Sequence, residues 1–258
     1  MSRIPDFPLL VFALSLVALW LSARIGGAIR KRQQGAEEEG RADFDSISAG
    51  ILTLLALIIG FSFSMAVSRY DQRKNYEEAE ANAIGTEYVR ADLLPAADAA
   101  RVRALLRTYL DQRLLFYDVN DSRQLQQIDA TTAQLQTDLW AAVQGPVAVQ
   151  PTPVVALAVS GMNDVLNSQG YTQAAWIYRI PGEAWLLMAV IAIFCNLMIG
   201  YGSRRTGAKG ILFLIIPIVV SISFFLIADI DSPRGGVIRL RPQNLMILAQ
   251  SLREHRSE

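Results

Sequence analysis

The sequence predicts an all-α integral membrane protein with two transmembrane helix hairpins and a helical extramembrane bundle. Three observations predict this fold class. Apolar residues make up 52% of the 258-residue chain, more than the roughly 45–50% of soluble proteins. They gather in four blocks, each close to the ~17–25 residues that cross hydrocarbon: residues 8–23, 47–67, 184–201 and 211–228. Between the second and third blocks, apolar residues recur at helical spacing.

The order of these blocks predicts four parts. They are a first transmembrane hairpin at 1–68, a helical extramembrane domain at 69–181, a second hairpin at 182–230, and a tail at 231–258 with a turn and an amphipathic helix. Asp6 precedes the first block and no small-residue cleavage site follows it, so we interpret this block as a span and not as a signal peptide. Pro95 suits the first turn of a helix, and the stretch "GPVAVQPTP" at 145–153 is expected to end another.

Composition excludes several function classes. The net charge is zero, so no nucleic-acid partner is expected. Cys195 and His255 are the chain's single cysteine and histidine, which excludes an intrachain disulfide or thiolate metal cluster and argues against histidine-based catalysis. No glycine-rich phosphate loop or metal-spaced His/Glu motif is present. We therefore expect no enzyme activity and no cofactor, and the sequence assigns no metal.

The short loops indicate an orientation. Residues 24–46 and 202–210 are rich in arginine and lysine, and the second loop carries Arg204, Arg205 and Lys209 with no acidic residue. Basic residues in short loops mark the cytoplasmic side. This places both termini and the domain at 69–181 on the outer side of the membrane.

The second apolar block carries one stripe of small or hydroxyl residues at helical spacing. Its members are Ser46, Gly50, Thr53, Gly60, Ser64 and Ser68, with Leu57 as the aliphatic member. Small residues allow close helix packing in lipid, and spacing alone favours that interpretation. The alternative is a water-facing pore wall in which Leu57 and Phe61 form an apolar constriction that gates by dewetting.

No proline interrupts residues 44–84, so one helix of roughly 60 Å is expected to continue from the membrane as a stalk. In a ring of subunits, acidic side chains on this stalk would repeat around the axis and attract cations. The ion-attracting or gating candidates are Arg69, Asp71, Glu77, Glu78 and Glu80, with Asp229 and Asp231 at the end of the fourth block. For the last two, a structural turn is the competing interpretation, and ion coordination or pairing with Arg69 is the functional one.

The stretch "GFSFSMAVSRY" at 60–70 resembles the second-span signature of bestrophins. The matching positions are Gly60, Phe61, Ser64, Val67, Ser68, Arg69 and Tyr70. The resemblance implies a helix that lines the pore of a pentamer, with an apolar neck that falls by spacing on Thr53, Leu57 and Phe61. Thr53 departs from the apolar pattern of that neck.

A closer similarity is to the bestrophin-like family of four-span proteins from bacteria and plants. It rests on "RYDQRKNYEEAEANAIGTEYVRADLLP" at 69–95 and "ADIDSPRGG" at 228–236. This similarity assigns no activity by itself. We expect a homo-oligomer in the lipid bilayer of a cell, here a bacterial inner membrane, with inorganic ions as its partners. A pentamer is expected by resemblance to bestrophins, and a tetramer stays open. Bestrophins place their long polar segment in the cytosol, whereas our interpretation follows the loop charges and places it outside.

We therefore expect an oligomeric ion channel of bestrophin-like type, with the second span lining the pore. The alternative is a non-conducting membrane sensor or scaffold whose helical extramembrane domain binds a partner.

Overall fold

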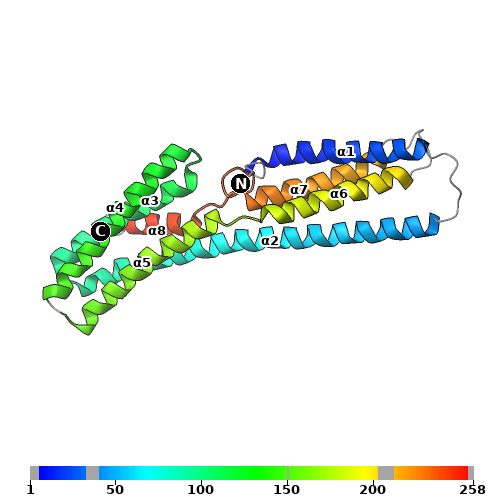
Figure 1. The fold of residues 1–258 in the computed structure, drawn as a ribbon. Helices are drawn as coiled ribbons and strands as arrows, with labels where there is room; N and C mark the ends of the chain where they lie inside the picture. The colour runs from blue at the N-terminus through cyan, green and yellow to red at the C-terminus, as the bar shows by residue number, and fades with distance from the viewer. Residues whose placement is uncertain (1–5, 33–40, 150, 203–211, 255–258) are drawn as a thin grey trace. The chain divides into compact units, whose positions relative to one another are not determined.

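The computed structural model describes residues 6–32, 41–149, 151–202 and 212–254. His255 and the loop residues Arg204, Arg205 and Lys209 lie outside the described residues. Throughout the described ranges the regular structure is helical and contains no strand, which confirms the all-α class. The elements in chain order (Figure 1) are α1 (Pro8–Arg32), α2 (Arg41–Arg90), η2 (Ala91–Leu93), α3 (Ala96–Asp118), α4 (Ser122–Val149), α5 (Pro153–Ile177), α6 (Gly182–Gly202), α7 (Leu212–Asp231) and α8 (Gln243–Glu254).

Four of the described helices are long and apolar enough to cross a membrane. The single helix expected over residues 44–84 is confirmed, and α2 extends beyond both ends of that range to 50 residues. At ~1.5 Å per residue it is about 75 Å long, whereas the hydrocarbon core of a bilayer is about 30 Å thick. The apolar first part of α2 is therefore enough to cross the membrane, and the charged second part extends beyond it.

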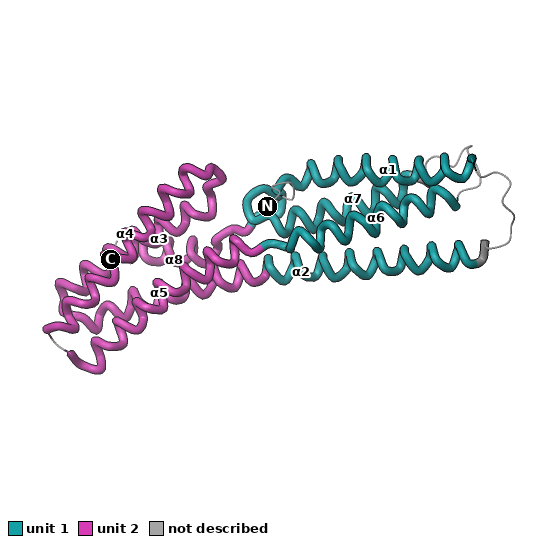
Figure 2. The backbone as a smooth tube through the Cα atoms, in the orientation of Figure 1, with its two compact units in different colours: residues 1–70, 179–239 teal, residues 71–178, 240–258 magenta. Residues whose placement is uncertain are grey.

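Contacts divide the chain into two compact units (Figure 2). Unit 1 contains Met1–Tyr70 and Arg179–Arg239, and unit 2 contains Asp71–Tyr178 and Leu240–Glu258. Each unit is thus assembled from two separate stretches of sequence. Helix α8, which the sequence analysis assigned to a tail, is part of unit 2, with Leu245 and Ala249 buried.

The core of unit 1 draws apolar side chains from α1, α2, α6 and α7. Its buried members include Val11, Leu19, Leu55, Ala66, Met188, Ala192, Val220, Phe224 and Ile227. All four apolar helices therefore contribute to one hydrophobic cluster.

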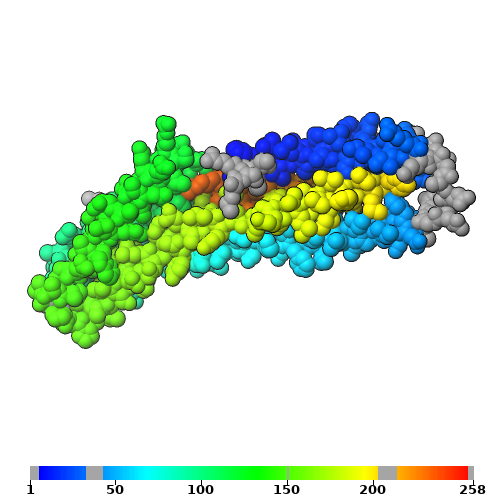
Figure 3. All heavy atoms as spheres, viewed as in Figure 1, coloured from blue at the N-terminus to red at the C-terminus, as the bar shows by residue number. Residues whose placement is uncertain are grey.

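Helices α1 and α6 approach each other at backbone distance. A Cβ atom added at Gly26 would lie 2.0 Å from the Leu197 carbonyl oxygen, and one added at Gly200 would lie 1.9 Å from the Ala23 carbonyl oxygen. Beside this crossing the Ser22 hydroxyl donates to the Ile193 carbonyl at 2.7 Å. Figure 3 shows the atoms of α1, in blue, directly against those of α6, in yellow. Close contact of small residues and interhelical hydrogen bonds are what hold helices together in lipid.

In unit 2, the helix end expected within residues 145–153 lies at Val149. Helix α4 continues through Gly145 and Pro146 before it ends, and the next helix begins at Pro153. Pro146 lies in the last turns, where its missing N–H costs a single backbone bond, and its ring is buried in the packing. The next helix has a defined start, because the Thr152 hydroxyl accepts from the Val155 N–H at 3.2 Å and Pro153 occupies the first turn.

The backbone crossing of α1 and α6 predicts different effects for two neighbouring glycines. Gly26→Ala should destabilise the protein by about 1–3 kcal/mol, since the new methyl group overlaps the α6 backbone. Gly27→Ala is the matched control, because its Cβ would meet the Gly200 carbonyl at an ordinary 3.6 Å and alanine favours a helix. Thermal unfolding in detergent, followed by circular dichroism, measures both. Equal shifts of the two midpoints would contradict the close crossing.

Candidate functional site

One face of α2 packs on its own chain and the opposite face does not. Within the apolar part, Leu55, Ser62 and Ala66 are buried. At about 100° per residue, the predicted pore residues lie on the other side of the helix. All of them are exposed in the single chain: Thr53, Leu57, Gly60, Phe61, Ser64 and Ser68. The structure thus brings these six side chains onto one open face.

This open face carries small or hydroxyl residues together with two large apolar side chains. Leu57 is 52% and Phe61 63% exposed. Apart from the adjacent residues and nearby backbone of its own helix, no atom lies within 4 Å of the position that a Cβ at Gly60 would occupy. The Thr53 hydroxyl donates to the Ala49 carbonyl of its own helix at 2.9 Å. In the most apolar 18-residue stretch of α2, only 17% is buried inside the chain, whereas 50% of the corresponding stretch of α7 is buried. Lipid, water or a second copy of the chain must therefore cover this face.

The acidic candidates on α2 separate into two groups. Asp71 and Glu78 are exposed and lie in the same angular sector as Leu57. Glu77 and Glu80 lie on the opposite, buried side. Arg69 is half-buried. Asp71 and Glu78 are therefore the two acidic candidates on α2 whose carboxylates remain exposed in the single chain.

Glu80 forms a buried ion pair with Arg113 of α3. A second bond joins Arg113 Nη2 to Glu80 Oε2 at 3.4 Å, and the Thr172 hydroxyl of α5 donates to the same oxygen at 2.9 Å. Burial alone would lower the pKa of Arg113, but the Glu80 carboxylate more than compensates and raises it. Together with the Thr172 hydroxyl, the pair joins three helices of unit 2.

Glu77 holds the start of α8. Its carboxylate accepts from the Leu245 backbone N–H at 2.9 Å and from the Asn244 side-chain amide at 2.7 Å. The first N–H groups of a helix have no partner within the helix, and a negative charge there is favoured by the helix dipole. Glu77 therefore caps a helix that is distant in sequence.

Asp229 and Asp231 are buried at the end of α7 and accept backbone hydrogen bonds. Asp229 accepts from the N–H groups of Val237 at 2.6 Å and Ile238 at 2.8 Å. Asp231 accepts from the Ile180 N–H at 3.2 Å through both oxygens. A Cβ at Gly236 would lie 2.6 Å from the Asp229 carbonyl oxygen, so only glycine fits this turn. Over the described ranges, no group of three or more His, Cys, Asp or Glu side chains is placed to hold a metal ion.

A comparison with protein families decides the identity. The model of the Bestrophin-like domain matches residues 9–245. The chain belongs to the bestrophin-like family. The match runs from the second residue of α1 through α7 and includes the stalk motif at 69–95 and the turn at 228–236, so the resemblance inferred from those motifs is confirmed. No curated protein matches the chain.

Solved structures share the fold of this bestrophin-like protein. One point variant of a bacterial bestrophin homolog from Klebsiella pneumoniae superposes with a TM-score of 0.66 at 14% identity, covering 100% of both chains. A second variant gives 0.68 at 12% identity, covering 96% of this chain and 97% of that one. A structure of the same homolog solved by Zn-SAD phasing gives 0.65 at 14% identity, covering 97% and 98%. At this identity the likeness establishes the fold.

Arg113 and Glu87 of this bestrophin-like chain are both buried and were not among the residues that the sequence pattern predicted. Each interrupts an apolar stripe at helical spacing. Arg113 lies four residues after Tyr109 and three before Phe116, and Glu87 lies three residues after Ile84. A charged residue inside a buried stripe was the signal that could have identified them.

Glu87 is a fully buried carboxyl group whose two oxygens have no hydrogen-bond partner. It lies against α5, where a Cβ at Gly161 would be 2.0 Å from Glu87 Oε2. Glu87 is 20 residues beyond Val67, about 30 Å past the apolar run. Burial raises its pKa to about 8, although the nearby Arg90 guanidinium opposes this shift. The group is therefore mostly protonated at neutral pH.

This raised pKa predicts that stability falls as pH rises. Because the pKa is about 8 in the folded protein against 4.5 without perturbation, the folded state holds the proton more tightly. The free energy of unfolding should decrease between about pH 4.5 and pH 8 and level off above that range. Glu87→Gln should remove this slope and raise stability at pH 8 by on the order of 3 kcal/mol. Glu78→Gln is the control, because Glu78 is exposed. Unfolding midpoints are measured from pH 5 to 9 for the wild type and both variants. The same pH dependence in all three proteins would contradict a raised pKa at Glu87.

Proposed function

We propose that this protein is a homo-oligomeric ion channel of bestrophin-like type, in which the open face of α2 lines the central axis. The observation that carries the proposal is the exposure of one continuous face with Thr53, Gly60, Ser64 and Ser68, opposite the face that packs on the chain's own core. A ring of copies would bring this face together from every subunit.

The chemistry of the face favours water over lipid. Lipid-facing helix surfaces are apolar, whereas hydroxyl groups in membranes are used between helices or beside water. Beyond the apolar run the same sector continues with Asp71 and Glu78, both exposed. Rings of carboxylates at a channel mouth attract cations. We therefore propose that Asp71 and Glu78 concentrate cations at one end of the path.

Leu57 and Phe61 are the proposed constriction. They are adjacent on this face. Their side chains lie outside the core of the chain, with Leu57 52% and Phe61 63% exposed. Rings of large apolar side chains close a pore by excluding water. Thr53 stands one turn before them, with its hydroxyl bonded to its own helix, and forms the polar edge of the proposed neck. Family resemblance favours five subunits, and the native mass of the purified complex distinguishes five from four.

The proposal predicts that shortening the constriction increases ion flow. Phe61→Ala and Leu57→Ala should raise the conductance of purified protein in planar bilayers several-fold, because less apolar surface remains to exclude water. Phe63→Ala is the matched control, since Phe63 is also exposed but lies about 160° around the helix from Phe61.

Two outcomes count against a pore at α2. One is a conductance that responds equally to Phe61→Ala and Phe63→Ala. The other is the absence of ion flux from folded oligomers of every variant, which would favour a non-conducting scaffold.

We also propose that unit 2 faces the outer side, on the basis of the basic short loops. Single cysteines in a Cys195→Ala background test this orientation with a membrane-impermeant maleimide on intact cells. Gln127→Cys in α4 should be labelled, whereas Ser46→Cys, at the opposite end of the apolar run, should react only after permeabilisation. Both native side chains are exposed. The reverse pattern would give the cytosolic placement that resemblance to bestrophins implies.

A further inference from the structure

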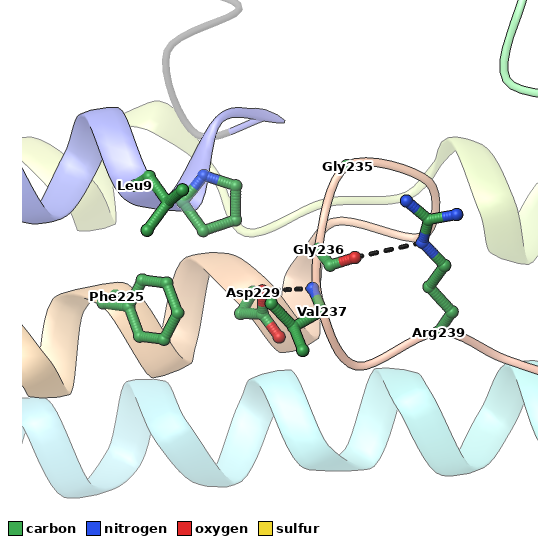
Figure 4. A pocket seen from close by; sticks show the side chains of 8 residues that line it. Leu9, Phe225, Asp229, Gly235, Gly236, Val237 and Arg239 are labelled. Atoms are coloured by element: carbon green, nitrogen blue, oxygen red, sulfur yellow. Dashed lines mark hydrogen bonds between the residues drawn. The ribbon is translucent and has the colours of Figure 1, made fainter.

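A pocket of about 370 Å³ lies within unit 1, where α1 begins and α7 ends. Figure 4 shows it between the first turn of α1, the last turns of α7 and the glycine-rich turn that follows. Its lining residues are Pro8, Leu9, Phe225, Asp229, Gly235, Gly236, Val237 and Arg239. Its volume lies within the range of roughly 300–1,000 Å³ that is usual for small-molecule sites.

One wall of the pocket is apolar and belongs to helices apolar enough to cross the membrane. Leu9 is 74% exposed in the single chain. Phe225 is half-buried and packs edge-on against Phe12 with ring centroids 6.4 Å apart. Asp229 follows the apolar run of α7 directly, so the pocket opens at the boundary between hydrocarbon and the polar region of a bilayer.

The opposite wall presents a positioned guanidinium group. Arg239 Nε donates to the Gly236 carbonyl at 3.1 Å (Figure 4). Arg239 is itself exposed, and among the described residues its side chain donates to this carbonyl. The bond holds one edge of the guanidinium, so its terminal nitrogens are left for a ligand. Arginine matches the oxygen geometry of a phosphate group.

The Asp229 carboxylate repels an anion in the pocket only weakly. Asp229 is buried, and its oxygens accept from the Val237 and Ile238 N–H groups at 2.6 and 2.8 Å. These donors compensate its negative charge. Arg239 is thus the accessible charged group of the pocket.

We propose that this pocket binds a membrane phospholipid, with the phosphodiester at the Arg239 guanidinium and the start of the acyl chains along Leu9 and Phe225. A free phosphate ion would use the arginine but not the apolar wall. A phospholipid uses both walls, and the remainder of its acyl chains lies in the adjoining bilayer. The proposal depends on membrane insertion and not on ion conduction.

Lipid retention measures this site directly. Full-length protein is purified in a mild detergent, exchanged into mixed micelles with phosphatidylglycerol or phosphatidylethanolamine, and washed, and bound lipid is quantified by mass spectrometry. Arg239→Gln should lower retained lipid several-fold. Arg241→Gln is the matched control, because Arg241 is also exposed but does not line the pocket, and it should retain lipid like the wild type. Circular dichroism confirms that the variants are folded.

A second variant separates a lipid from a simple anion. Leu9→Asn changes the apolar wall and should also lower retention, whereas inorganic phosphate at millimolar concentration should leave retention by the wild type unchanged. Equal loss of lipid in Arg239→Gln and Arg241→Gln would show attraction by general surface charge and overturn the proposal. Retention that phosphate abolishes and Leu9→Asn leaves intact would identify a free-anion site and overturn it as well.

Discussion

Helix α2 must keep one stripe buried along most of its length, and the packing of both units depends on that constraint. Ala66, Arg73, Glu80 and Glu87 follow one another at intervals of seven, and each is buried. Seven residues correspond to nearly two full turns, so such positions stay on one side of a helix with a small drift. The same geometry leaves the opposite side free throughout, which makes that side available for contacts outside the protomer.

The side chains of the buried stripe change from uncharged to charged beyond the apolar part of α2. In unit 1 it consists of Leu55, Ser62 and Ala66, which pack without charge. In unit 2 it carries charged groups, and Glu77 and Glu80 are each matched by a different element, Glu77 by the start of α8 and Glu80 by Arg113 of α3. Removing one partner of a buried pair leaves an uncompensated charge, which costs about 3–5 kcal/mol. Each carboxylate therefore selects the helix that packs beside it.

Sequence periodicity predicted the helices well because apolar length and spacing are local properties. The four spans, the continuous α2 and the helix after Pro95 all follow from them. The acidic candidates on α2 show what periodicity did not predict. Asp71, Glu77, Glu78 and Glu80 were grouped as one charged region, although a turn of about 100° per residue already separates Glu77 and Glu80 from the other two. Their partners, Arg113 and the α8 N-terminus, are 33 and 168 residues away, and a single sequence contains no sign of such pairings. The position of Pro146 inside a helix, with its ring buried, is likewise not revealed by spacing, because it involves packing against neighbouring residues.

The division of both units into separate stretches of sequence has a consequence for biosynthesis. Unit 1 needs α6 and α7, which are made only after α3, α4 and α5 of unit 2, and unit 2 needs α8, which is made after α7. Until then the Glu77 carboxylate lacks its α8 partner, and Gly85 lacks the Leu248 side chain, which lies 3.1 Å from the position of a Cβ at that glycine. Domains usually fold in order as they are synthesised. Here unit 1 can close only after synthesis has passed Arg239, and unit 2 only after α8 has been made, so both units close late and their early helices wait for partners that are made much later.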